Sequence, residues 1–176
     1  METLDGQQCP ICGKNTLTLS EGDQEVPYFG KLVVFGMNCS SCGFKKSDIE
    51  AFEPKDPVKF SLEIDSEKDM NIRIVKSSEA TVNIPRIIKM EPGPASNGYV
   101  TNVEGLLLKA KDVIETMRDS EEDKAVKKKC KNMLKKLQKV MWGQETIKIT
   151  LEDPSGNSAI ISEKAEKSKL SVKKNK

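Results

Sequence analysis

Two cysteine motifs decide the fold at the start of this chain: Cys9-Pro10-Ile11-Cys12-Gly13 and Cys39-Ser40-Ser41-Cys42-Gly43. In each motif two residues separate the cysteines, so both thiolates can point into one tight turn, and the glycine that follows suits a positive φ. Two such turns brought together supply four sulfur ligands in a tetrahedron, the arrangement that structural zinc prefers. We therefore predict one structural Zn²⁺ ion bound by Cys9, Cys12, Cys39 and Cys42.

Two other interpretations of these cysteines stay open on sequence alone. Iron can occupy a site of the same geometry, and closely spaced cysteines can also form redox-active dithiols or disulfides. A thioredoxin-like dithiol is expected on one pair only, at the start of a helix, whereas this chain has two pairs. The fifth cysteine, Cys130, lies far from both motifs and is predicted to be a small buried apolar residue.

The composition of the 176 residues excludes several classes of protein. The chain contains no histidine, which excludes histidine bases and mixed cysteine and histidine metal sites and makes cupin-like metal chemistry a weak alternative. No apolar run approaches the roughly 20 residues that cross a bilayer, and the first residues are acidic, unlike a secretory signal. We expect a cytoplasmic protein without a membrane partner, in which closely spaced cysteines bind metal.

The segment between the cysteine motifs is predicted to form strands. Residues 16–20 alternate threonine with leucine, residues 32–37 are an apolar run rich in strand formers, and residues 21–30 resemble a turn. This pattern predicts a zinc ribbon over residues 1–50, in which two turns meet at one end of a small antiparallel sheet. A unit of this size buries too little surface to fold alone, so the metal is expected to stabilise it.

Residues 51–163 are predicted to form a second, mainly β domain. Val58, Phe60, Leu62 and Ile64 alternate with polar residues, and the same alternation recurs over residues 70–74, 80–84, 88–90, 147–151 and 159–162. Short alternating segments separated by turn residues indicate an antiparallel sandwich or barrel. The tail, residues 164–176, is rich in lysine and is predicted to be disordered.

A helical hairpin is predicted within this domain, at about residues 101–142. Thr101 and Glu104 have the form of a capping box, and apolar residues then recur at helical spacing. The acidic residues 119–123 form the connection, and a second apolar stripe follows. Two helices joined by a short polar loop should pack as an antiparallel hairpin.

Nucleic-acid binding is an alternative function for this chain. Residues 124–139 contain eight lysines and no acidic residue, and a basic helix can bind nucleic acid, although a solvated lysine face is common. Residues 1–50 contain four lysines and seven acidic residues, which disfavours phosphate contact by the ribbon. Nucleic acid is therefore a possible but disfavoured partner.

The sequence lacks the usual motifs of catalysis. It contains no phosphate-binding loop of the Gly-x-x-x-x-Gly-Lys type and no nucleophile elbow, and periodicity places no acid and base together. We therefore expect a protein that is not an enzyme and that acts through its surfaces. Its oligomeric state cannot be derived from these patterns.

The order of several motifs resembles the Zpr-type zinc-finger family. Besides the cysteine motifs, the resemblance rests on Val26-Pro27-Tyr28-Phe29-Gly30-Lys31, Thr81-Val82-Asn83-Ile84-Pro85, Glu91-Pro92-Gly93, the stretch from Tyr99 to Leu107, and Asp153-Pro154-Ser155-Gly156-Asn157-Ser158. It implies a four-cysteine zinc ribbon followed by a double-stranded β-helix, or jelly-roll-like, domain that carries the helical hairpin. It also implies that Cys9, Cys12, Cys39 and Cys42 bind the zinc ion.

The same resemblance implies a partner. Eukaryotic members of the family bind translation elongation factor one-alpha, notably in its GDP-bound state, and act in its biogenesis or folding. They carry two modules in tandem, whereas this sequence has one, as archaeal relatives do. By resemblance, the expected partner contacts are Tyr28, Phe29, Asp153, Gly156 and Asn157.

Overall fold

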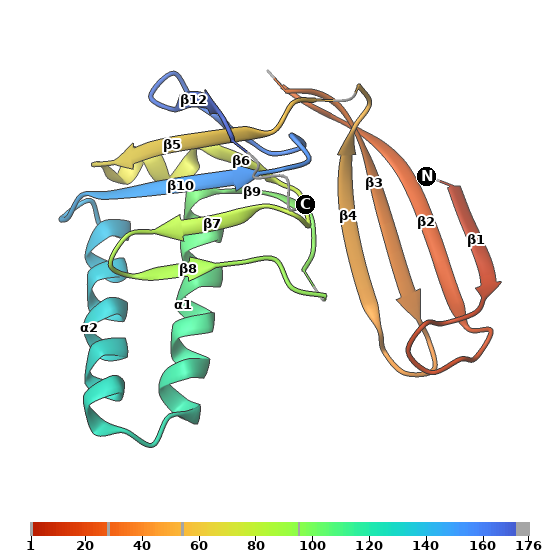
Figure 1. The fold of residues 1–176 in the computed structure, drawn as a ribbon, viewed down its shortest axis with the longest axis horizontal. Coiled ribbons are helices and arrows are strands. Elements are labelled where there is room, and N and C mark those ends of the chain that lie inside the picture. Colours follow the sequence, from red (N-terminus) through yellow and green to blue (C-terminus); the bar gives the residue numbers. More distant parts are fainter. Residues whose placement is uncertain (1, 28, 54, 95, 172–176) are drawn as a thin grey trace.

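The computed structural model describes residues 2–27, 29–53, 55–94 and 96–171, and it divides into a ribbon and a jelly roll (Figure 1). The ribbon is one antiparallel sheet in the order β1-β2-β3-β4. Its strands are β1 (Glu2–Gln7), β2 (Leu17–Val26), β3 (Gly30–Cys39) and β4 (Lys45–Ala51). Cys9 and Cys12 lie between β1 and β2, while the second motif joins β3 to β4, so both meet at one end of the sheet as predicted.

The ribbon sheet is larger than the sequence predicts. Strands β2 and β3 pair continuously from Leu17 opposite Cys39 to Val26 opposite Gly30, so the segment predicted as a turn is mostly strand. The turn itself is tight, with the Phe29 amide donating to the Val26 carbonyl at 3.0 Å. Strands β1 and β4, which carry many polar residues, were not predicted, because their pairing depends on the neighbouring strands and not on an apolar alternation.

The jelly roll consists of two facing antiparallel sheets. One has the order β12-β5-β10-β7-β8 and the other β11-β6-β9. Their strands are β5 (Val58–Ile64), β6 (Arg73–Lys76), β7 (Thr81–Ile84), β8 (Ile88–Met90), β9 (Tyr99–Asn102), β10 (Ile147–Asp153), β11 (Ala159–Ile161) and β12 (Glu166–Lys169). The alternating apolar residues of β5 are buried between the sheets, as the period-2 pattern predicts.

Two elements differ from the prediction in this domain. Met70 lies in a 3₁₀ helix, η1 (Glu67–Asn71), so the strand predicted from residue 70 begins only at Arg73. Residues 166–169 form β12, which pairs with β5 along its whole length. The predicted disorder of the tail is therefore wrong for residues 166–169, and residues 172–176 lie outside the described residues.

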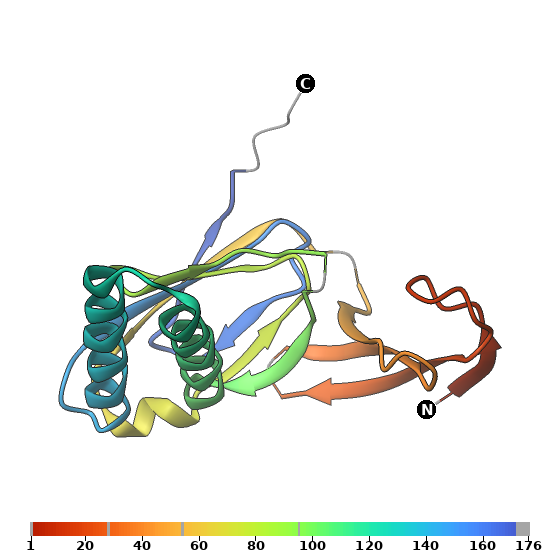
Figure 2. The same ribbon diagram turned by 90° about the horizontal axis from the view of Figure 1, so that it is seen from below.

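The predicted helical hairpin is confirmed. Helix α1 (Val103–Ser120) packs against α2 (Lys124–Met141), on the side of the jelly roll away from the ribbon (Figure 2). The cap of α1 is Asn102, which accepts from the Gly105 amide at 2.8 Å, and not the predicted box of Thr101 and Glu104. Cys130 is buried in the core, as predicted. Within the described ranges, neither helix has the length and hydrophobicity that crossing a membrane requires.

The ribbon and the jelly roll share a hydrophobic cluster. Val26, Leu32 and Ile49 of the ribbon and Val75 of β6 are all nearly inaccessible to solvent and pack together. Four side chains that are fully or largely removed from water contribute roughly 1.5–3 kcal/mol each. The two parts are therefore held as one body by apolar contact, and the small ribbon gains a core that it lacks by itself.

Polar side chains of the jelly roll cover the free edge of β4. Asn97 Oδ1 accepts from the Ser47 amide at 2.9 Å, and Asn157 Oδ1 accepts from the Ala51 amide at 3.0 Å. The Gly98 amide donates to the Ser47 carbonyl at 3.0 Å. These groups take the place of a fifth strand, so the edge of the ribbon is satisfied without further sheet pairing.

We predict that Asn157→Ala loosens this junction. The Ala51 amide loses its acceptor, which should cost about 1 kcal/mol of stability and raise the hydrogen-exchange rate of that amide several-fold, measured by NMR. Asn157→Asp is the matched control, because it retains an acceptor oxygen at the same place. Unchanged protection of the Ala51 amide in Asn157→Ala would show that the bond contributes nothing.

Candidate metal centre

The two cysteine turns have the same backbone geometry. The Gly13 amide donates to the Cys9 carbonyl at 2.9 Å, and the Gly43 amide donates to the Cys39 carbonyl at 3.0 Å. Gly13 and Gly43 have φ values of +70° and +72°, which confirms the expected left-handed conformation. A side chain at either position would be strained, so each glycine permits the turn that aims two sulfurs in one direction.

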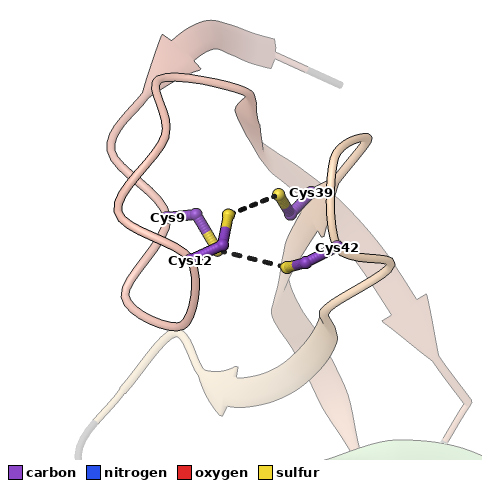
Figure 3. A group of neighbouring side chains, drawn as sticks. All are labelled: Cys9, Cys12, Cys39 and Cys42. Carbon is purple, nitrogen blue, oxygen red and sulfur yellow. Dashed lines mark hydrogen bonds between the residues drawn. The ribbon is translucent and has the colours of Figure 1, made fainter.

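The four sulfur atoms fit a tetrahedral zinc ion. The Sγ atoms of Cys9 and Cys42 are 3.7 Å apart, those of Cys12 and Cys39 are 3.8 Å apart, and all four lie within 4.8 Å of one another (Figure 3). Zinc–sulfur distances of about 2.3 Å in a tetrahedron require sulfurs about 3.8 Å apart. A disulfide would need about 2.05 Å. The arrangement therefore favours the zinc interpretation over the disulfide.

The surroundings of the cysteines act differently on Cys39 and Cys42. The Phe44 amide lowers the pKa of Cys42, but burial and the neighbouring cysteine side chains outweigh it and raise that pKa to about 12. Cys9 and Cys39 are buried, and together with Leu17 they form a small cluster of their own. The Thr16 hydroxyl lies 3.3 Å from Cys39 Sγ, and this bond, with the amides of Cys42 and Ser41, lowers the pKa of Cys39 to about 6 against the effect of burial. Cys39 is thus prepared as a ligand at neutral pH.

The predicted partner contacts gather where the ribbon meets the jelly roll. Phe29, in the turn between β2 and β3, is half-buried and packs against the clusters of both parts. The Lys55 ammonium lies 3.3 Å from the centre of its ring. Tyr28 lies outside the described residues. Phe29 therefore fills space between the ribbon and the jelly roll, and it also lines a cavity at the surface.

The turn after β10 is structural to a large extent. Asp153 is completely buried, which favours a structural role for its side chain, and its contact with a partner stays a prediction. Gly156 has a φ of +75°, and a Cβ there would lie 2.5 Å from the Asp56 carbonyl oxygen. The Asn157 side chain is engaged with Ala51. Aspartate, glycine and asparagine are common in turns of any role. Their presence in the sequence therefore could not distinguish a packing role from contact with a partner.

Sequence reasoning missed other residues of the junction. Asp48 accepts hydrogen bonds from the amide of Ser78 and from its hydroxyl, which joins β4 to the jelly roll. Gly98 approaches β4 so closely that a Cβ would lie 2.8 Å from the Ile49 nitrogen. The only signal in the sequence was the Asn97-Gly98 pair, which by itself predicts an ordinary turn.

Fold and site together define a zinc-ribbon protein: a four-cysteine ribbon docked on a jelly roll with a helical hairpin. The known protein families agree with this description. The ZPR1 zinc-finger domain matches residues 2–53 and the ZPR1 jelly-roll domain matches residues 68–176. The chain belongs to the ZPR1 family.

Individual relatives extend from archaea to eukaryotes. The chain is 37% identical to an uncharacterized ZPR1-like protein of Methanocaldococcus jannaschii, over 97% of this chain and 87% of that protein. A similar protein of Pyrococcus horikoshii is 37% identical over 92% of this chain and 75% of its own length. The zinc finger chaperone zpr1 of Schizosaccharomyces pombe is 31% identical over 86% of this chain but only 33% of that protein.

Proposed function

We propose that this protein is a non-catalytic, cytoplasmic protein-interaction module that acts as an adaptor or chaperone for translation elongation factor one-alpha, preferring its GDP-bound state. The observation that carries the proposal is the match to a relative named as a zinc finger chaperone. The match spans 86% of this chain, so the shared part includes the junction of ribbon and jelly roll. Phe29 lies at this junction and is the described residue that we favour for contact.

The buried polar groups support a non-catalytic role. Asp153 is surrounded by hydroxyl and amide donors, and buried Asp69 is held by Lys164 and the amides of Asp65 and Ser66. Such fully engaged carboxylates stabilise a fold, whereas a catalytic base must be free to reach a substrate proton. The zinc shell consists of four protein ligands, as in structural sites.

The proposal is tested by titrating the protein with elongation factor one-alpha loaded with GDP or with GTP. We expect saturable binding that is at least tenfold tighter for the GDP form, measured by calorimetry. Protein stripped of zinc by chelation is the control, and it should not bind. Absence of saturable binding to both nucleotide states would contradict the proposal.

Nucleic-acid binding remains a second candidate because the lysines of α2 form an exposed face. Lys128, Lys131 and Lys135 are exposed at helical spacing, and in the described chain Lys139 is the α2 lysine paired with a carboxylate, that of Glu145 at 3.0 Å. Generic RNA is therefore included in the titration at several salt concentrations. Tight, steeply salt-dependent RNA binding would favour this function if replacing Lys128, Lys131 and Lys135 with alanine abolishes it.

A further inference from the structure

The last two strands of the described chain belong to different sheets. Strand β11 pairs with β6, whereas β12 pairs with β5, although only the turn of residues 162–165 separates β11 from β12. Each is the outermost of the described strands in its sheet. The two strands therefore diverge, and a cavity of about 1110 Å³ opens between them, which we call the β11–β12 groove.

Among the described residues, no strand other than β5 pairs with β12, so its outer edge carries backbone groups without a strand partner there. The Leu170 amide donates to the Pro57 carbonyl at 3.2 Å, and the register continues with Lys169 opposite Val58. In an antiparallel pair, successive residues direct their backbone groups alternately toward and away from the partner strand. The amides and carbonyls of Lys167 and Lys169 thus point away from β5, and both residues line the groove.

The groove combines an apolar floor with a charged border on which lysines outnumber acidic residues. The residues that give it apolar surface include Phe29, Val58, Phe60, Ala159 and Ile160. At its border are three exposed lysines and two exposed acidic residues, namely Lys55, Lys167, Lys169, Asp56 and Glu163.

Two of these lysines lie near aromatic rings, and neither forms an ion pair within the described part of the chain. The ammonium of Lys55 is 3.3 Å from the ring centre of Phe29, and that of Lys167 is 5.9 Å from the ring centre of Phe60. Burial lowers the pKa of Lys55, and the nearby charge of Lys167 lowers it further, while the charge of Glu53 opposes both effects. An acidic group placed between these cations would relieve their repulsion.

We propose that the β11–β12 groove binds an extended polypeptide segment of a partner protein, with alternating apolar and acidic side chains, which adds a strand to the edge of β12. Strand addition satisfies the outward backbone groups of Lys167 and Lys169. Alternate side chains of the added strand point to opposite faces, so apolar ones reach the floor while acidic ones meet the lysines. The chain's own sequence after Ser171 carries three lysines, so its charge makes it an unfavourable occupant.

This inference rests on the proposed function, because it specifies the chemistry of the segment that a polypeptide-binding module receives. Phe29 and Gly156, two of the predicted partner contacts, line the same groove. A synthetic peptide tests the groove without the elongation factor. Peptide binding without factor binding removes the factor proposal alone, and factor binding without peptide binding removes the groove alone.

The probe is a fluorescent six-residue peptide of alternating glutamate and valine, with blocked termini, titrated by anisotropy into the full-length zinc-bound protein. We expect saturable binding, with NMR shifts at Lys167, Lys169 and Phe29. A lysine and valine peptide of the same length should bind at least tenfold more weakly. Equal binding of the two peptides, no saturable binding, or binding of an RNA oligonucleotide in place of the peptide would overturn the proposal.

Variants of Lys167 separate its charge from its backbone amide. Lys167→Glu should weaken peptide binding at least tenfold, while Lys111→Glu, on helix α1 away from the groove, should leave it unchanged. Lys167→Pro removes an amide that points away from β5, which an edge strand tolerates, and should bind at least fivefold more weakly than Lys167→Ala. Equal affinities of the Pro and Ala variants would overturn strand addition. The comparison of the acidic and basic peptides uses the unaltered protein, so it does not depend on how any variant folds.

Discussion

Removing zinc, by chelation or by Cys39→Ser, is expected to unfold the ribbon and to abolish partner binding. In the described part of the chain, the buried core at the cysteine end of the ribbon is a small cluster of Cys9, Leu17 and Cys39, with Cys12, Leu19 and Phe44 packed against it. Structural zinc supplies roughly 10–16 kcal/mol of apparent binding free energy, far more than such a cluster can replace. Hydrogen exchange should show loss of protection in β2 and β3, with zinc content falling from one ion per chain to none.

The matched control for this experiment is Cys130→Ala. This cysteine is buried in the core of the jelly roll and helices, so its replacement should lower stability slightly while zinc content and the ribbon stay intact. Protected amides in the ribbon of a protein without bound metal would refute the structural role of the zinc ion. The jelly roll has its own core, so we expect it to remain folded after zinc is removed.

The second large effect is expected for Asp153→Ala. Asp153 Oδ2 accepts from the hydroxyls of Ser77 at 2.9 Å and Ser158 at 2.5 Å, and Oδ1 accepts from the Ser155 amide at 2.8 Å. Burial lowers the pKa of Lys76, and the charge of Asp153 opposes this effect. Alanine leaves the donors unpaired and Lys76 without this counter-charge, so stability should fall by about 3–5 kcal/mol.

Urea unfolding measures this loss, and zinc content separates it from damage to the metal site. Asp153→Asn is the control, because it keeps the shape and part of the acceptor capacity and should lose less than the alanine variant. Zinc stoichiometry should stay at one in both. If Asp153→Ala kept full stability but lost partner binding, the residue would be a contact and not a structural group.

Much of the fold follows from local patterns in the sequence. The spacing Cys-x-x-Cys-Gly determines each cysteine turn. Two thiolates must bind one ion and the glycine takes a positive φ, so the five residues have few other backbone conformations open to them. The alternation in β5 and the apolar stripes of the two helices identify buried faces in the same way. Cys130 is also predictable, since an isolated apolar position on a helical stripe packs inward.

Pairing between distant segments is harder to predict. Strand β12 consists of exposed residues, Glu166 to Lys169, whose composition indicates a disordered tail. It is ordered because β5 offers an open edge about a hundred residues earlier in the chain. Strands β1 and β4 depend on partners in the same way, so a pattern confined to each segment could not reveal them.

The sequence by itself identified the four candidate sulfur ligands, since the Cys-x-x-Cys spacing pairs the cysteines and the absence of histidine rules out mixed cysteine and histidine sites. Only the tertiary structure decided what the turn at residues 153–158 does. Its residue types occur both at the surface and in the interior of proteins. In the structure, Asp153 is fully buried, and Asn157 accepts a hydrogen bond from the amide of Ala51, 106 residues away in the chain. The same is true of the β11–β12 groove, because a cavity between two sheet edges exists only once both sheets have formed.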